Sequence, residues 1–207
     1  MVTDFSGATL DVLGDDGIFT RQAVDLAGQL GFGQIRVWGD VLPAMNASVH
    51  TGSRDGFRED DCTHLFVALF DVPERLATVK TLRHCNLVSL VHPRAVVNPT
   101  ARVGRNVYID PLAYVGMEAV VGDAVGLSSR TSVEHDNVIG EGVFLGAGAT
   151  LCGHVHVGAG SFVGAGSVVT PRVQVCGGVT IGAGAVVVRD IERPGIYVGS
   201  PARLMQK

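Results

Sequence analysis

Branched aliphatic residues recur at every sixth position through the second half of the chain. From Val97 to Val187, each sixth residue is Val, Leu or Ile, sixteen times in succession. The residue two positions earlier is often small, as at Ala113, Ala149 and Ser167. A period of six matches neither a helix of 3.6 residues per turn nor a heptad seam, and it is typical of a β-solenoid built from hexapeptides.

The hexapeptide period assigns each side chain a place in that solenoid. Because side chains alternate along a strand, the aliphatic residue and the small residue two positions before it both point inward. Three hexapeptides make one triangular coil, so residues 18 apart are expected to stack about 4.8 Å from each other. The sixteen repeats predict a little over five coils. The glycine that often follows the aliphatic residue is expected to turn the corner.

Residues 1–90 lack this period and predict a small α/β domain. Its strands are expected over 8–14, 34–40, 64–70 and 87–91, its helices over 15–32 and 72–85, and a loop over 41–62. This order favours a Rossmann-like, mostly parallel sheet with helices on its faces. The sequence therefore predicts two domains, 1–90 for binding the acceptor and 91–207 for the solenoid with an irregular C-terminal tail.

Charge and cysteine content narrow the possible partners and location. The net charge is −4 and the basic residues do not cluster, so no nucleic-acid partner is expected. The four cysteines, at positions 62, 85, 152 and 176, lack disulfide or metal spacing and predict reduced thiols. No apolar run has transmembrane length, and the first residues lack the features of a signal peptide. We expect a cytoplasmic protein with no membrane partner.

The turn after the first predicted strand admits two interpretations. Such turns often bind phosphate because backbone N–H groups converge there. Here the turn is Gly14-Asp15-Asp16-Gly17, and two adjacent carboxylates would repel a phosphate. It is either a tight turn that caps a helix or an altered nucleotide-sugar site containing Gly14, Asp16 and Gly17. In the second case Asp40, at the end of the next strand, contacts the ribose or base.

Three phrases follow the α/β domain in a fixed order. They are LVHPRAVV at 90–97, SVEHDNVIGEG at 132–142 and VGSPARLM at 198–205. With them, the whole chain resembles the bacterial hexapeptide-repeat sugar O- and N-acetyltransferases, which include sialic-acid O-acetyltransferases and acetyltransferases of nucleotide-linked 4-amino sugars. The resemblance implies a left-handed parallel β-helix, a homotrimer with coenzyme A sites between neighbouring helices, acetyl-CoA as acyl donor, no metal, and a nucleotide sugar or another sugar as acceptor.

Acetyl transfer to an amine or hydroxyl needs a base of near-neutral pKa, and histidine suits this role. His135 lies two residues after the inward Val133, so it points outward near a corner, and the resemblance implies that it is the base. Asp136 matches the carboxylate that orients this histidine in the family. Glu134 is the competing candidate.

The 18-residue spacing connects these residues to the next coil. Gly153 is expected directly above His135, and the resemblance implies that its N–H stabilises the oxyanion. The alternative is a corner glycine with no further role. His154 stacks over Asp136 and either pairs with it structurally or draws it away from His135.

A groove for coenzyme A is expected along the Gly-Ala-Gly segments 146–148, 158–160, 164–166 and 182–184, together with residues 198–203 of the tail. Small side chains let a ligand lie close to the backbone, although most of these glycines would also be needed simply to turn corners. Arg189 or Arg203 would lie near the phosphates. The residues assigned to the cofactor are Gly146, Gly153, Gly164, Ala165, Arg189, Pro201 and Arg203.

Three residues depart from the family pattern near the acceptor. Phe144 stands where many relatives have a second histidine that contacts the acetyl group. Ser128 stands where relatives often have asparagine beside the sugar, and Arg130 is larger than the usual residue. Ser128 and Arg130 are nevertheless assigned to the acceptor, and Arg130 suits one with additional negative charge.

These observations support three hypotheses. The first is an acetyl-CoA-dependent acetyltransferase that modifies an amino or hydroxyl group of a sugar during bacterial surface glycan synthesis. The second is a zinc-dependent carbonic anhydrase with this fold, which needs three convergent histidines; His135, His154 and His156 are present without the expected spacing. The third is a non-catalytic binding or scaffold protein that kept the fold and lost the acceptor site.

Overall fold

The computed structural model describes residues 5–15, 17–39 and 49–205. The chain divides into two compact units, a front unit over residues 1–93 and a solenoid unit over residues 94–207. Among the described residues, no helix is long and apolar enough to cross a membrane.

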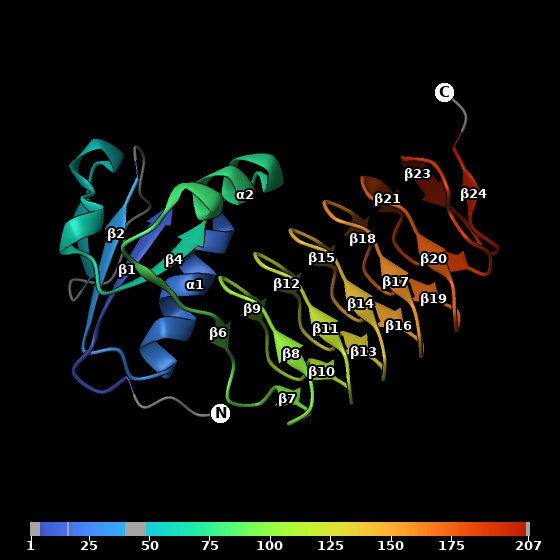
Figure 1. The fold of residues 1–207 in the computed structure, drawn as a ribbon, viewed down its shortest axis with the longest axis horizontal. Coiled ribbons are helices and arrows are strands. Elements are labelled where there is room, and N and C mark those ends of the chain that lie inside the picture. The colour runs from blue at the N-terminus through green and yellow to red at the C-terminus, as the bar shows by residue number, and fades with distance from the viewer. Residues whose placement is uncertain (1–4, 16, 40–48, 206–207) are drawn as a thin grey trace. The chain divides into compact units, whose positions relative to one another are not determined.

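The front unit contains a five-stranded parallel sheet in the order β3-β2-β1-β4-β5 (Figure 1). Its elements are β1 (Thr9–Gly14), α1 (Ile18–Gln29), β2 (Gln34–Trp38), β3 (Val49–Gly52), the short 3-10 helices η1 (Arg54–Gly56) and η2 (Glu59–Asp61), β4 (His64–Ala68), α2 (Val72–Thr81), β5 (Asn86–Leu87) and β6 (Leu90–Val91). The expected small α/β fold with a parallel sheet is confirmed.

Two expected elements of the front unit differ from the structure. The segment 41–62 contains β3, η1 and η2 in its described part, so the prediction of a loop was wrong there. Strand β3 is short and polar, and it forms because it pairs in parallel with the edge of β2, with Val49 opposite Ile35. Helix α2 ends at Thr81 rather than near residue 85, because Leu82 already has extended backbone angles.

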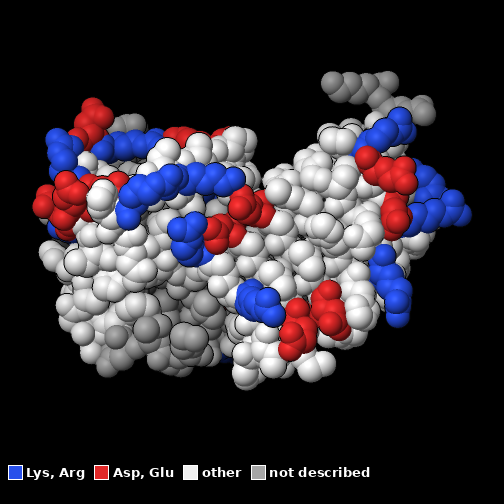
Figure 2. Space-filling view, viewed as in Figure 1, with Lys and Arg blue, Asp and Glu red and all other residues white. Residues whose placement is uncertain are grey.

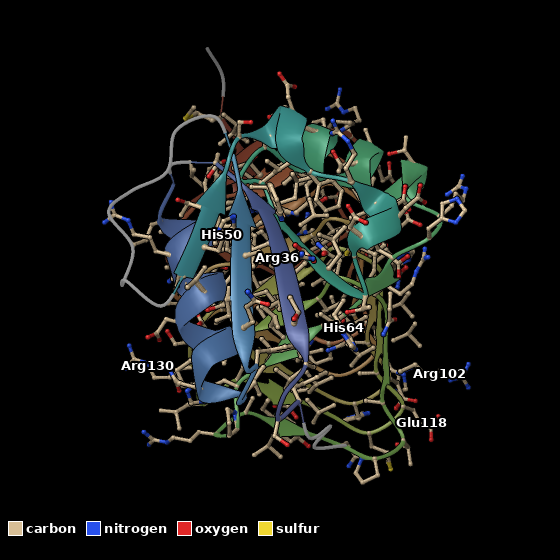
Figure 3. The ribbon with its side chains drawn as sticks, turned by 90° about the vertical axis from the view of Figure 1, so that its left-hand side faces the viewer. Arg36, His50, His64, Arg102, Glu118 and Arg130 are labelled. Atoms are coloured by element: carbon tan, nitrogen blue, oxygen red, sulfur yellow. The ribbon has the colours of Figure 1, made fainter. Side chains whose placement is uncertain are left out.

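The two faces of the front sheet differ in polarity. One face packs against α1, where Phe19 meets Phe66 edge-on with ring centroids 6.0 Å apart. The other face bears Asp11, which is only 1% exposed. Its carboxylate accepts hydrogen bonds from Arg36 Nη2 at 2.6 Å and from Trp38 Nε1 at 2.7 Å; Figure 3 labels Arg36. A buried carboxylate is stable only when it is paired in this way.

The solenoid unit is built from short strands that pair in parallel with the strands 18 residues before and after. Val133, for example, lies between Val115 and Leu151. The strands form three faces, whose rows are visible in Figure 1. The expected solenoid of hexapeptide coils is confirmed.

The strands of each face follow at regular intervals along the chain. Face 1 comprises β7 (Val96–Val97), β10 (Tyr114–Val115), β13 (Ser132–Val133), β16 (Thr150–Leu151), β19 (Val168–Val169) and β22 (Val186–Val187). Face 2 comprises β8 (Arg102–Val103), β11 (Val120–Val121), β14 (Val138–Ile139), β17 (His156–Val157) and β20 (Gln174–Val175). Face 3 includes β9 (Tyr108–Ile109), β12 (Gly126–Leu127), β15 (Phe144–Leu145), β18 (Phe162–Val163), β21 (Val179–Ile181), β23 (Gly195–Val198) and β24 (Arg203–Leu204).

The interior of the solenoid is filled as the period predicts. From Ile109 to Val187, each aliphatic residue of the series is at most 2% exposed. The small residues two positions earlier, such as Ala149 and Ser167, are also fully buried. The solenoid therefore presents its remaining residues outward at fixed positions.

The glycine that often follows the aliphatic residue has a different role from the expected one. The left-handed backbone conformation that turns the corner lies two residues later, at Gly148 and Gly166 for example. A Cβ on Gly140 would lie 2.6 Å from Ala159 N, and one on Gly164 would lie 2.5 Å from Ala183 N. These glycines are needed because successive coils approach too closely for a side chain.

Candidate active site

The residues predicted to be catalytic lie at one corner of the solenoid, which we call the His135 corner. Residues 134–137 connect β13 to β14, and residues 152–155 connect β16 to β17 one coil further along. Both segments join face 1 to face 2. Stacking of the two segments brings together polar residues that are 18 positions apart in the sequence.

His135 and Asp136 form a hydrogen-bonded pair at this corner. His135 Nδ1 lies 2.7 Å from Asp136 Oδ2, and the two side chains are 51% and 39% exposed. The hydrogen bond with His135 holds the pKa of the Asp136 carboxyl below its usual value, and the nearby His154 acts in the same direction. Asp136 is therefore ionised at neutral pH. With Nδ1–H donating to this carboxylate, the neutral ring has Nε2 as its unprotonated nitrogen.

Of the two candidate carboxylates, Asp136 contacts the imidazole. Glu134 instead accepts a hydrogen bond from the Ser132 hydroxyl at 2.6 Å. Asp136 has φ of 58°, in the left-handed region that aspartate enters more readily than most residues. The corner conformation thus places the carboxylate of Asp136, rather than that of Glu134, against the ring.

Gly153 lies directly beside the His135 ring. A Cβ at Gly153 would lie 2.6 Å from both Cε1 and Nε2 of His135, so a side chain there would displace the imidazole from this position. In the part of the chain that the structure describes, the Gly153 N–H donates no hydrogen bond. An unpaired N–H beside a histidine ring nitrogen is suited to bind a developing oxyanion.

His154 forms the third member of the cluster. Its Nε2 is 3.8 Å from Asp136 Oδ2, and its ring lies edge-on to that of His135 with centroids 5.1 Å apart. Its N–H donates to the His135 carbonyl oxygen at 3.1 Å. Asp136 keeps its short contact with His135, so His154 does not draw it away.

The three side chains also offer ligand atoms within 4.8 Å of one another, as metal ligands do. A three-histidine zinc site would need His156 as well. His156 does not belong to this cluster; it lies on β17 and lines a cavity of about 410 Å³ with Gln174 and Asp190. Among the described residues, the histidines of the carbonic anhydrase hypothesis are not gathered into one ligand set.

The residues assigned to coenzyme A lie in more than one place. Gly146, Gly164 and Ala165 belong to the corner between face 3 and face 1, which we call the glycine corner. It lies at the opposite end of the face 1 strands from the His135 corner, where Gly153 lies. One chain therefore does not gather the four residues at one corner.

Within the predicted Gly-Ala-Gly segments, the two glycines differ in accessibility. A Cβ on Gly146 would lie 2.7 Å from Ala165 N, and a Cβ on Gly164 would lie 2.5 Å from Ala183 N. Gly148, Gly166 and Gly184 have positive φ, and a Cβ on any of them would meet nothing within 4 Å. The open positions of these segments are therefore their last glycines, rather than Gly146 and Gly164.

The C-terminal tail contains the remaining residues assigned to the cofactor. Arg189 follows β22, Pro201 lies between β23 and β24, and Arg203 begins β24. Strand β24 pairs antiparallel with β23, with Arg203 opposite Val198. Val198 in turn packs so close to Gly182 that a Cβ there would lie 2.8 Å from its Cγ1. The tail therefore folds back onto the last coil, near the end of the glycine corner.

The residues assigned to the acceptor are not gathered with His135. Ser128 and Arg130 lie at the glycine corner, and Figure 3 shows Arg130 on the opposite side of the solenoid from Glu118. Glu118 lies 18 residues before Asp136, at the His135 corner. Phe144, on face 3, stacks on Phe162 with ring centroids 5.6 Å apart.

The other acceptor residues belong to the front unit. Asp16 and Asp40 lie outside the described residues. Gly14 and Gly17 flank the turn between β1 and α1. Gly14 lies against the Thr20 side chain and Gly17 against the Asp15 side chain.

Surface charge is mixed on the face shown in Figure 2, where basic and acidic side chains lie interspersed. In the solenoid, Arg105 and Asp123 form an ion pair of 2.7 Å.

Comparison with known proteins agrees with this geometry. The family described as bacterial transferase hexapeptide (six repeats) matches residues 136–171. The acetyltransferase domain of PglB from Neisseria gonorrhoeae, solved with acetyl coenzyme A, matches with a TM-score of 0.88 and 26% identity, over 97% of this chain and 100% of that one. The chain has the repeat and the fold of the hexapeptide sugar acetyltransferases. The resemblance found in the sequence is thereby confirmed.

Two further structures extend the match. PerB from Caulobacter crescentus, solved with CoA and GDP-perosamine, matches with a TM-score of 0.86 and 29% identity, over 95% of this chain and 97% of that one. WeeI from Acinetobacter baumannii shares the fold, with a TM-score of 0.85 and 20% identity over 96% of this chain and 100% of that one. No curated protein matches the sequence. These matches support the expected enzyme class, an acyltransferase.

Proposed function

We propose that this protein transfers the acetyl group of acetyl-CoA to an amino or hydroxyl group of a sugar, with His135 as general base. The observation that carries this proposal is the His135–Asp136 pair beside the unpaired N–H of Gly153. Support for the donor and acceptor comes from relatives of 26% and 29% identity that were solved with acetyl coenzyme A, or with CoA and GDP-perosamine. The setting would be bacterial surface glycan synthesis in the cytoplasm.

Each part of the His135 corner has a role in this reaction. His135 Nε2 takes the proton of the acceptor as its nitrogen or oxygen attacks the thioester carbonyl carbon. The carbonyl oxygen becomes an oxyanion that accepts a hydrogen bond from the Gly153 N–H. The C–S bond then breaks, and the proton on His135 passes to the departing thiolate of coenzyme A. Asp136 stabilises the imidazolium that exists between these two proton transfers.

We further propose that the active unit is a homotrimer in which neighbouring chains complete the site. The open glycines at 148, 166 and 184 make the glycine corner the best candidate for the pantetheine arm, with Pro201 beside it and Arg189 or Arg203 near the phosphates. This corner lies at the other end of the face 1 strands from His135. A closed threefold assembly would supply the glycine corner of one chain to the His135 corner of the next.

The proposal is tested by replacing the base. His135→Ala is expected to lower kcat/KM for acetyl transfer by a factor on the order of 10² to 10⁴, the usual contribution of a general base. The affinity for coenzyme A, measured by isothermal titration calorimetry, should not change. His156→Ala is the matched control, since His156 is exposed and lies outside the cluster. Activity of His135→Ala equal to that of the control would refute the assignment.

A non-catalytic binding protein is the second candidate. It is favoured by Phe144, which stacks on Phe162 where relatives have a histidine, and by the altered residue Ser128. It predicts that coenzyme A binds while no sugar or nucleotide sugar is acetylated. The same calorimetric titration, combined with an assay of thiol release, separates the two candidates.

A further inference from the structure

The turn between β1 and α1 lies where a parallel sheet of this type commonly binds phosphate. The chain leaves β1 toward β2 on one side, while β4 pairs with the other side of β1. The carboxyl ends of β1 and β4 therefore form the point at which the strand order reverses, and ligands bind outside such points. In this protein the chain places a carboxylate of its own there.

Asp15 occupies the hydrogen-bond donors at this point. Its Oδ1 accepts from the Gly17 N–H at 2.9 Å, at the start of α1, and its Oδ2 accepts from the Phe70 N–H at 3.1 Å, just after β4. The Asp15 N–H itself donates to the Thr20 hydroxyl at 3.1 Å. Three backbone N–H groups from three parts of the fold are thus paired within the chain.

The two glycines of the turn give space to these same side chains. A Cβ on Gly17 would lie 2.7 Å from Asp15 Oδ1, and a Cβ on Gly14 would lie 2.7 Å from Thr20 Cγ2. In a phosphate-binding turn, glycines allow the backbone to approach the ligand. Here they accommodate Asp15 and Thr20 instead.

The positive charge beside the turn is directed into the protein. Arg75 interacts electrostatically with Asp15, yet it is only 3% exposed. Its guanidinium donates to the carbonyl oxygens of Leu69 at 2.6 Å and Phe70 at 3.3 Å. Ile18 and Phe70, which are 64% and 66% exposed, add apolar surface near the turn. A phosphate would therefore meet the charge of Asp15 without direct access to Arg75.

We infer that Asp15 is a specificity-determining residue that excludes nucleoside diphosphates from this turn. The acceptor is accordingly a sugar that carries no nucleotide diphosphate. This inference rests on the proposed acetyltransferase function and narrows its substrate class. Its physical basis is that a bound phosphate would have to displace the carboxylate from the Gly17 and Phe70 N–H groups and overcome its charge.

The test is calorimetric titration of GDP, UDP and coenzyme A into three forms of the protein. The wild type is expected to bind coenzyme A but neither nucleotide at millimolar concentration. Asp15→Ala should gain affinity for at least one nucleotide of about tenfold or more, because a like-charge contact is removed and the N–H groups are freed. Asp25→Ala, which removes an exposed carboxylate from α1, should behave as the wild type.

A second variant addresses the stability of the turn. Asp15→Asn removes the charge and keeps one of the two oxygens that accept the Gly17 and Phe70 N–H groups, so it should disturb the turn less than Asp15→Ala and show a smaller gain. Nucleotide binding by the wild type would overturn the inference, and so would the absence of a gain in both Asp15 variants. Failure of the wild type to bind coenzyme A would instead count against the proposed function, whatever the nucleotide titrations give.

Discussion

The two units of this protein position their polar side chains by different means. In the solenoid, His135, Asp136 and Gly153 owe their places to a repeating backbone, and residues 18 apart meet because coils stack. In the front unit, Asp15 is held by hydrogen bonds from the start of α1 and the end of β4. The position of a side chain is set by a local period in the first case and by contacts between distant segments in the second.

This difference affects how each unit tolerates change. A polar residue at a solenoid corner can be exchanged without disturbing the inward residues that support it. A polar residue such as Asp11 in the front unit connects β1 to two residues of β2, so its loss should disturb the fold around it. Four variants test this difference between the two units, in order of decreasing expected effect.

Val133→Asp should abolish folding of the solenoid. Val133 is fully buried between Val115 and Leu151, and a carboxylate in so narrow a core finds no partner. We expect no soluble assembly, as judged by light scattering and circular dichroism. Val138→Asp, at an outward position that is 43% exposed, should remain folded. A folded trimer of Val133→Asp would show that the inward register is wrong.

Asp11→Ala should destabilise the front unit by about 2 to 3 kcal/mol, because Arg36 and the Trp38 N–H lose their buried acceptor. Hydrogen exchange should become faster in β1 and β2 and stay unchanged in the coils of the solenoid. Asp25→Ala, at an exposed position, should change stability by less than about 0.5 kcal/mol. Equal acceleration of hydrogen exchange in both units would show that the effect of Asp11 is not confined to the front unit.

Asp136→Asn should lower kcat/KM by a factor on the order of 10², since the amide stabilises the imidazolium far less than the carboxylate does. Steady-state kinetics of acetyl transfer by the purified variant measure this loss. Glu134→Gln should stay within about threefold of the wild type, as Glu134 contacts Ser132. A large loss of kcat/KM in Glu134→Gln and a small one in Asp136→Asn would show that the assignment of Asp136 is wrong.

His154→Gln should have the smallest effect, a change in kcat/KM of less than about fivefold. His154 Nε2 is 3.8 Å from Asp136 Oδ2 and the His154 ring lies edge-on to that of His135, so it borders the catalytic pair while Asp136 keeps its shorter contact with His135. Steady-state kinetics of acetyl transfer measure the change. A loss of kcat/KM as large as that of Asp136→Asn would show that His154 has another role.

Much of the solenoid could be predicted from the sequence because its period determines long-range contacts. Gly153 stacks beside His135 and His154 beside Asp136 because the two residues of each pair are 18 positions apart. The structure has both contacts. What the period does not determine is which carboxylate contacts the imidazole. That choice depends on the left-handed backbone of Asp136 and on the hydrogen bond that occupies Glu134.

Less of the front unit could be predicted, for physical reasons. Strand β3 has little hydrophobic alternation and exists because it pairs with β2. The turn at Gly14 to Gly17 has glycines that suit either a ligand or a side chain. The sequence of the turn does not decide between the two, since Phe70, whose N–H donates to Asp15, lies 55 residues away.

The close approach of coils at Gly140 and Gly164 also restricts how the length of this protein can vary. Removing one hexapeptide would rotate all later residues by a third of a coil and move Gly153 away from the edge that carries His135. Heritable gains and losses within the repeats should therefore occur in whole coils. Extra residues are best accommodated at Gly160, at the corner between face 2 and face 3, where the backbone borders open space.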